Sequence, residues 1–352
     1  MNEYKPLKNI INYDIRSSGS NFRCVLMIFW FVLIFFGIMG CNESLQVPAN
    51  SDSFSVEELE YKAIKIIGDA LVDENPRIRA NATEIAASTQ QLQLMPKVQE
   101  LLKDDFVPVR FAAALAIGDT QYHVAKNILR QLLNDPDENV RIAAAYGLYK
   151  LGWAAGFELL IKSITHENQD IRANAAVLLG KTGDRRALQV LYEAKDSVDS
   201  EHKVRIQAAE AIARLGDKRI YPKLWAALIS YYADDRVIGI KGMGALGTKK
   251  GKNALLSMLD DDILEVRLAA AEQLGMLGYA EGEPEVLDVF EKKLLLEMDR
   301  ESAERVKVLT ALAIGRIGTP ALTQLLPGLL KDSSTFVRLT AAKAVLQCIK
   351  RG

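Results

Sequence analysis

The sequence predicts an all-α fold, an α-solenoid in which about nine helix hairpins stack into a superhelix. First, a motif anchored on a basic residue returns nine times between residues 79 and 338, at steps of 31, 31, 31, 33, 31, 31, 40 and 31 residues. So constant a period indicates a stack of equal units. Second, alanine and leucine dominate and aromatic residues make up only 7%, which favours helix over strand. Third, the apolar residues of the motif share one helix face.

The first 40 residues are predicted to be a secretion leader. Residues 24–40 read CVLMIFWFVLIFFGIMG, an uncharged apolar run preceded by a net positive flank. The run is short for a membrane span, which takes about 20 residues. Ile38-Met39-Gly40-Cys41 resembles a bacterial lipobox, although Met39 departs from its usual pattern, and the resemblance implies that Cys41 is lipidated. The alternative is an uncleaved signal anchor.

Both interpretations place the folded part in the bacterial cell envelope, on the extracytoplasmic side of a membrane. Residues 41–54 are polar, lack periodicity and contain a proline, so they are predicted to form a flexible tether. The repeat array is expected to occupy residues 55–350.

The repeat is defined by columns counted from its anchor. The third and fourth residues after the anchor are nearly always small, the seventh is mostly large and apolar, and the eighth is usually Gly or Ala. These offsets lie on one face of a helix. Gly stands at the eleventh position of six repeats, where a helix would end in the left-handed conformation. These glycines are Gly152, Gly183, Gly216, Gly247, Gly278 and Gly318.

A second amphipathic segment precedes each motif, for example residues 124–134 and 252–260. Each repeat is therefore expected to be two antiparallel helices with the anchor on the second. One hairpin cannot bury both faces, so the hairpins stack into a curved rod. The 40-residue step adds residues between Gly278 and Glu301, which predicts a longer first helix and loop there.

Over residues 55–350 the pattern Asp…Val-Arg-x-x-Ala-Ala…Leu-Gly, as in DENVRIAAAYGLYKLG (137–152), resembles the HEAT family. The resemblance is to the short HEAT-like repeats named after phycobilisome lyases. It implies a solenoid whose second helices line the concave side. It says little about function, because these repeats serve many roles.

Most anchors have an acidic residue six positions before them, such as Asp104 before Arg110. We interpret this pattern structurally: the acid caps the helix start, and the arginine pairs with acids or carbonyls of adjacent repeats. This predicts a ladder that holds the repeats in register. Its members are Arg79, Arg110, Arg141, Arg172, Arg205, Arg236, Arg267 and Arg338, with Lys307 in the equivalent place of one repeat.

The surface of the second helices supplies the candidate partner site. The second, fifth and ninth positions after the anchor vary freely, so they are expected to be exposed. At the fifth position, Leu115, Tyr146 and Val177 predict an apolar docking patch. At the ninth, the basic residues Lys150, Lys181 and Arg214 are suited to an acidic partner. Alternatively, these cations complement the helix dipole and the aliphatic side chains are partly covered.

The chain offers little for catalysis. Related HEAT proteins, the deoxyhypusine hydroxylases, bind two irons with several His-Glu pairs, whereas this chain has one, His166-Glu167. Its other histidines are His123 and His202. We therefore predict no catalytic site, no metal site, no cofactor and no small-molecule substrate.

Two further motifs are interpreted structurally. Gly242-Met-Gly-Ala-Leu-Gly247 with the lysines after it resembles a phosphate loop but lacks the strand and the Ser/Thr of that motif, so close helix packing is expected. Cys348 lies in an apolar helical run and is predicted to be a core residue.

A net charge of −1 gives no sign of nucleic-acid binding. The leading hypothesis is a lipid-anchored scaffold that binds another protein along its concave face. The alternative is an enzyme or enzyme accessory subunit of the HEAT-like lyase or hydroxylase kind. A third possibility is a mainly structural envelope protein.

Overall fold

Outer and inner helices alternate along the chain, as the period predicts. The computed structural model describes residues 55–351, and all regular elements in that range are helical. The all-α solenoid prediction is confirmed. The leader (1–40), Cys41 and the tether (41–54) lie outside the described residues.

Each inner helix carries a motif anchor. The inner helices are α2 (Pro76–Ser88), α4 (Val107–Asp119), α6 (Glu138–Lys150), α8 (Gln169–Thr182), α10 (His202–Arg214), α12 (Ala233–Leu246), α14 (Leu264–Met276), α16 (Arg300–Ile317) and α19 (Thr335–Ile349). The outer helices are α1 (Val56–Ala70), α3 (Met95–Glu100), α5 (Lys126–Leu132), α7 (Ala155–Ser163), α9 (Leu188–Asp196), α11 (Tyr221–Leu228), α13 (Lys249–Ser257), α15 (Glu283–Glu291), and the short α17 (Pro320–Thr323) and α18 (Leu326–Leu329).

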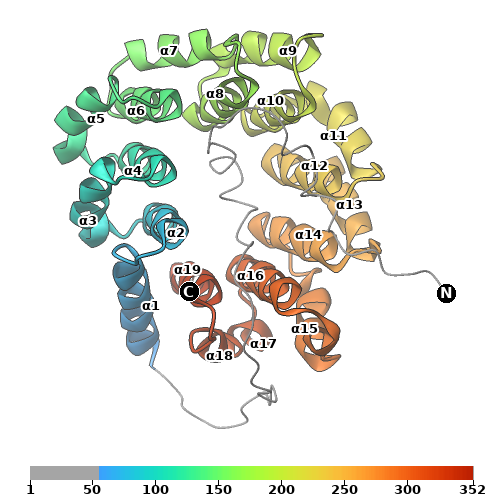
Figure 1. Cartoon of the computed structure of the whole chain (residues 1–352). Coiled ribbons are helices and arrows are strands. Elements are labelled where there is room, and N and C mark those ends of the chain that lie inside the picture. The colour runs from blue at the N-terminus through green and yellow to red at the C-terminus, as the bar shows by residue number, and fades with distance from the viewer. Residues whose placement is uncertain (1–54, 352) are drawn as a thin grey trace.

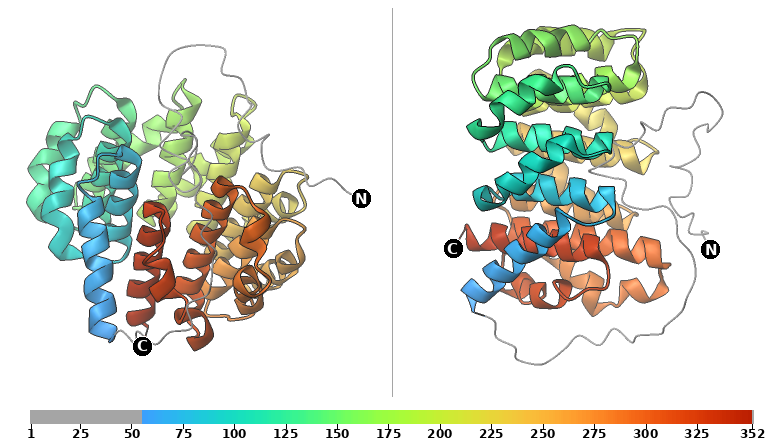
Figure 2. Two further views of the ribbon diagram at one scale, coloured as in Figure 1. Left: turned by 60° about the horizontal axis from the view of Figure 1, so that its bottom comes forward. Right: turned by 60° about the vertical axis from the view of Figure 1, so that its left-hand side comes forward.

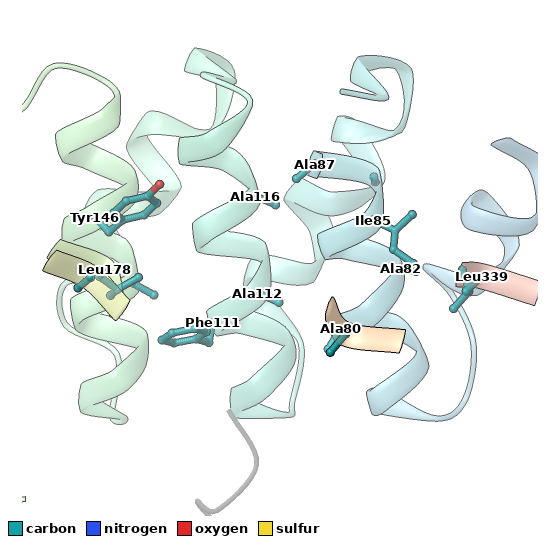
Figure 3. Packing of buried hydrophobic residues seen from close by; sticks show 14 of the residues in the cluster. Ala80, Ala82, Ile85, Ala87, Phe111, Ala112, Ala116, Tyr146, Leu178 and Leu339 are labelled. Carbon is teal, nitrogen blue, oxygen red and sulfur yellow. The ribbon is translucent and has the colours of Figure 1, made fainter. Parts of the chain in front are cut away.

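The stack closes on itself, so the molecule is a ring rather than the expected curved rod (Figure 1). The last inner helix, α19, packs against both α1 and α2. At this seam Leu339 of α19 lies across from Ala82 and Ile85 of α2 (Figure 3), and all three are buried. An open solenoid would leave an apolar face at each end. Here the two end faces cover one another.

Small residues on the inner helices explain the tight curvature. A Cβ added to Gly118 would stand 2.8 Å from the Cα of Gly147, and one added to Gly180 would stand 2.7 Å from the Cβ of Ala211. Neighbouring inner helices therefore approach almost to backbone contact, while neighbouring outer helices contact each other little. Each hairpin is therefore rotated relative to the one before it, and these rotations add up to a closed ring.

The turns that follow the inner helices have the predicted conformation. All six glycines eleven residues after an anchor have positive φ, between 61° and 88°. The first two repeats have Gln90 (φ 59°) and Gln121 (φ 51°) at the same position, so the left-handed turn forms there without glycine. These turns form one edge of the ring, which we call the glycine rim. Its turns are 89–91, 120–122, 151–154, 183–184, 215–217, 247–248, 277–282 and 318–319.

The turns that lead into the inner helices gather at the opposite edge (Figure 2). We call this edge the acid-turn rim; its turns are 71–75, 104–106, 133–137, 164–168, 197–201, 229–232, 261–263, 292–299 and 330–334. The 40-residue step has the predicted longer loop (292–299) but not the predicted longer first helix. Its outer helix α15 is short, and the inner helix α16 instead begins one turn earlier, at Arg300, after a 3-10 turn (Leu294–Glu297).

Candidate interaction surfaces

The arginine ladder lies just inside the acid-turn rim and joins consecutive repeats. Arg110 binds Asp135 of the next turn through Nε–Oδ2 (2.8 Å) and Nη2–Oδ1 (3.0 Å). Arg79 pairs with Asp104 and Arg236 with Asp261 in the same way, at 2.8 Å, and Lys307 makes a single contact with Asp332 at 2.7 Å. Most of these arginines also donate to carbonyls of their own turn, as Arg110 does to Asp104 O (2.8 Å). One guanidinium thus ties its own turn to the next, as expected.

The ladder changes partners in the middle of the ring. The turn after Arg141 has His166 in place of the acid, and Arg141 contacts the half-buried Glu138 on its own helix at 3.4 Å. Arg205 folds back onto its own turn, donating to the carbonyls of Ser197 (3.0 Å) and Ser200 (2.8 Å).

The other departures keep a contact between segments. Arg172 donates to Ser200 Oγ in the next turn at 2.7 Å. In the lengthened repeat, Arg267 pairs with Glu285 of α15 at 2.7 Å. Arg338, the last anchor, donates to the carbonyls of Asp332 and Ser333.

The acid six residues before the anchor does not cap the helix itself, contrary to our interpretation. Asp135 Oδ1 accepts from Asp137 N at 2.9 Å and so folds the turn. The residue that caps the helix lies two positions later: Asp137 accepts from Asn139 N at 2.8 Å. With its turn fixed, the acid presents both oxygens to the arginine of the preceding repeat.

The predicted docking patch is largely covered. Tyr146, expected to be exposed, has no exposed surface; its hydroxyl donates to Asp119, and the Lys181 ammonium binds the other oxygen of that carboxylate at 2.8 Å. The fifth position faces the interior of the ring, where side chains of neighbouring inner helices cover it. Leu115 and Val177 are half-buried there.

The predicted basic positions are also mostly engaged. Lys181 is half-buried in the contact just described, and Lys150 is half-buried at the end of α6. Arg214 is exposed and pairs with Glu210 one turn earlier, at 2.8 Å. Lys181 and Arg214 thus satisfy local carboxylates, which fits a structural role better than a free basic stripe.

Charged side chains of distant repeats share the ring interior. Burial raises the pKa of Glu84 on α2, against the opposing influence of Lys343 on α19 and Lys181 on α8. Burial likewise lowers the pKa of Lys241 on α12, opposed by Glu210 and nearby acids. The inner surface of the ring therefore carries charged side chains of both signs. It is not the apolar face expected of a docking groove.

No group of three or more metal-binding side chains occurs among residues 55–351. His166 and His202 instead contact the carboxylates of Glu138 (3.2 Å) and Asp235 (2.7 Å) near the acid-turn rim. Burial raises the pKa of the half-buried Cys348 thiol, which keeps it protonated.

The glycine-rich run 242–247 is a packed helix. A Cβ on Gly242 would stand 2.4 Å from Leu224, and one on Gly244 would stand 2.1 Å from Gln273. Gly247 ends α12 in the left-handed conformation. The close-packing interpretation of these glycines is confirmed.

Within the described range, no helix has the length and apolar character that crossing a bilayer requires.

An exposed apolar cluster on the acid-turn rim was not foreseen from the sequence. In the turn between α11 and α12, Ile229 (68%), Tyr231 (87%) and Tyr232 (68%) are exposed, and the two tyrosine rings meet edge to face at 5.5 Å. Val198 in the preceding turn is 89% exposed. We call these four residues the aromatic patch. This turn has Ser230 where most repeats have the acid, so its sequence, ISYYADD, already signals the departure.

A second unforeseen feature is a set of basic pairs on the glycine rim. Three consecutive turns of this rim are each followed directly by two exposed basic residues. These pairs are Arg185-Arg186, Lys218-Arg219 and Lys249-Lys250. Their sequences, GDRR, GDKR and GTKK, recur at the repeat period. The stack therefore brings them together on one edge of the ring.

A family model described as HEAT repeats matches residues 64–149, 130–201 and 157–239. No curated protein sequence matches the chain. Among solved structures, the chain is similar to one from the complex of CpcE and CpcF of phycocyanin lyase from Nostoc sp. PCC7120, with 18% identity over 72% of this chain and 99% of that one (TM-score 0.45).

Two further solved structures have a comparable sequence identity to this chain. Human deoxyhypusine hydroxylase has 19% identity over 75% of this chain and 98% of that one (TM-score 0.37). Importin beta has 16% identity over 82% of this chain and 45% of that one (TM-score 0.35).

Proposed function

This chain belongs to the HEAT-repeat family, and we propose that it is a lipid-anchored scaffold of the bacterial envelope that binds another protein through the aromatic patch. The single observation that carries the partner site is the exposure of Tyr231, Tyr232, Ile229 and Val198 on adjacent turns. Tyrosines and aliphatic residues exposed together are typical of protein interfaces. The predicted concave patch is replaced as the partner site because Tyr146 is fully buried.

The charges around the aromatic patch specify the partner. Asp199 and Glu201 are exposed beside Val198, and Asp262 is exposed in the following turn; Glu201 lies 3.3 Å from Lys203 and Asp262 lies 3.1 Å from Arg236. An apolar cluster flanked by carboxylates fits a partner surface with an apolar centre and a basic border. Complementary charge raises the association rate and selects the partner.

The lipid anchor rests on the sequence around Cys41. An apolar run that ends in Ile-Met-Gly-Cys supports cleavage before the cysteine and its acylation. Replacing Cys41 by Ala is expected to leave an unlipidated chain that keeps its leader. Metabolic labelling with an alkyne fatty acid, followed by membrane fractionation, tests this; label that persists in Cys41→Ala would contradict the lipid anchor.

Site-specific photo-crosslinking tests the partner site. A photoreactive amino acid at Tyr231 is expected to trap one protein of constant mass in intact cells. The matched control is Val124, which is 71% exposed on the glycine rim. Adducts of equal yield at both positions, or none at Tyr231, would overturn the assignment. Stoichiometric iron in the purified chain, with no adduct, would instead favour an enzyme of the hydroxylase kind.

A further inference from the structure

Basic residues concentrate on the glycine rim in the three consecutive repeats around α9, α11 and α13. Each turn contributes two exposed bases and at most one acid, and those acids, Asp184 and Asp217, are already hydrogen-bonded to Arg186 and Arg219. The remaining cations, Arg185, Lys218, Lys249 and Lys250, leave this edge positively charged although the whole chain carries −1. We call the three basic pairs the basic edge.

The helical segments that begin at the basic edge do not explain it. All three pairs stand at the start of a helical segment, η6 (Arg185–Ala187), η7 (Lys218–Ile220) or α13. The start of a helix carries the positive end of its dipole, where a cation is unfavourable. Thr248, the cap of α13, has no charge to offset Lys249 and Lys250. Arg185 instead donates to the carbonyl of Leu215 at the end of α10 (2.6 Å), whereas Lys218, Lys249 and Lys250 stand at helix starts whose local field opposes them, which points to an external anion.

Aromatic side chains accompany these cations. Tyr221 at the start of α11 stacks on Trp225 with ring centroids 6.4 Å apart, and the Lys250 ammonium lies 6.0 Å from the centre of the Tyr221 ring. Trp225 is 41% exposed. Trp and Tyr beside lysine is the combination favoured at the headgroup level of a bilayer.

The start of the described chain lies at the same rim. Helix α1 runs antiparallel to α2, so it begins at the edge where α2 ends, the glycine rim (Figure 2). Cys41 is 14 residues before Ser55, a stretch that spans at most about 50 Å. If Cys41 is held in the bilayer, the start of α1 stays within about 50 Å of the membrane surface. The glycine rim is then the part of the ring nearest to the tether.

We infer that the basic edge docks on the headgroups of anionic phospholipids, so that the ring lies with its glycine rim on the bilayer and its aromatic patch directed away from it. This inference rests on the proposed lipid anchor. Each basic residue adds to the attraction of an anionic surface, and an anchor plus a basic cluster is the usual pair of signals for stable attachment. The orientation leaves the acid-turn rim free for the protein partner.

Hydrogen exchange of the full lipidated chain in vesicles tests the orientation. We expect segments 184–190, 217–225 and 248–254 to exchange about tenfold more slowly on vesicles with about 30% phosphatidylglycerol than on pure phosphatidylcholine. About 0.5 M NaCl is expected to abolish the difference. The variant Lys218→Glu/Lys249→Glu/Lys250→Glu is expected to lose it.

The matched control is Lys103→Glu/Lys162→Glu/Lys292→Glu, which makes the same change in net charge with exposed lysines near the acid-turn rim. It is expected to keep the protection. Equal exchange on both vesicle types, or protection that appears only with an acidic protein, overturns the inference. Flotation of the chain with vesicles reports the anchor separately, and crosslinking at Tyr231 reports the partner site, so the failure of each is distinguishable.

Discussion

Arg79 and Asp104 are 25 residues apart and meet in a two-pronged ion pair, with Nε–Oδ2 and Nη2–Oδ1 both at 2.8 Å. The separation equals the repeat period less the six residues between acid and anchor. The same pair recurs as Arg110–Asp135 and Arg236–Asp261. A shift of one repeat along the next would break these contacts, so they fix the register of the stack.

Removing one ladder arginine should destabilise the ring. Arg110→Ala leaves Asp135, whose side chain is 5% exposed, without its cation. We expect the free energy of unfolding in urea to fall by about 3 kcal/mol, because the charge left behind is buried. Arg141→Ala is the matched control. It also removes two hydrogen bonds that the arginine donates to carbonyls of its turn, but the carboxylate left without a partner, Glu138, is 34% exposed. That ion pair should contribute less than about 1 kcal/mol. Equal losses would contradict the register role.

Asp184 should make stability depend on pH in the acid range. It accepts hydrogen bonds from Arg186 (2.6 Å) and from the Tyr149 hydroxyl (2.9 Å), and the arginine contacts lower its pKa to about 2. Its carboxylate therefore stabilises the fold fully above the unfolded pKa of about 4, and that stabilisation is lost as the pH falls from 4 towards 2.

The Asp184→Asn variant tests this dependence. At pH 7 we expect it to be less stable than the native chain by about 1 kcal/mol, and the difference should shrink below pH 4. Melting curves from pH 3 to 7 would measure it, with the exposed Asp105→Asn as control. A difference that is constant with pH would mean that the carboxylate charge is not what matters.

The sequence predicts the repeat far better than the ring. Hairpins and turn glycines follow from residues within one period and are confirmed, and the anchors Arg79, Arg110 and Arg236 pair with the next turn as expected. Closure depends on a small rotation between neighbouring repeats, summed over all of them, which no single repeat reveals. Leu339 at the seam directly follows its anchor, and the sequence does not distinguish it from the apolar residues at the same position of other repeats. Tyr146 is buried between Asp119 of the preceding inner helix and Lys181 of the following one, so its exposure was predicted wrongly. The aromatic patch and the basic edge were visible as ISYY and as the recurring GDRR, GDKR and GTKK; a column-by-column reading of the turns would have found them.

Glycine at the eighth position should be required by helix approach. Gly180→Ala would place its Cβ 2.8 Å from the Cα of Ala211 on α10, backbone that cannot move aside. We expect a loss of about 1–3 kcal/mol in unfolding free energy, although alanine is the better helix former. Gly68→Ala in α1 is the control of opposite sign: its Cβ would meet the tips of two flexible side chains, Leu94 at 3.4 Å and Lys97 at 3.9 Å, so a gain of about 0.5–1 kcal/mol is expected. A stabilising Gly180→Ala would show that the inner helices are not in contact.

The closed seam should open when a charge is buried in it. Leu339 is 1% exposed and faces α2 (Figure 3), so Leu339→Asp leaves an unpaired carboxylate between the first and last repeats. Spin labels at the exposed Tyr61 on α1 and Lys350 beyond α19 should then give a broad distance distribution in place of a narrow one. Leu268→Asp, at the matching position of α14, is buried equally and should disturb the ring elsewhere while the Tyr61–Lys350 distance stays narrow. No covalent turn connects the first and last repeats of the described range, so the seam depends on packing and on charges such as Glu84 and Lys343; a distribution already broad in the native chain would mean that the ring is open in solution.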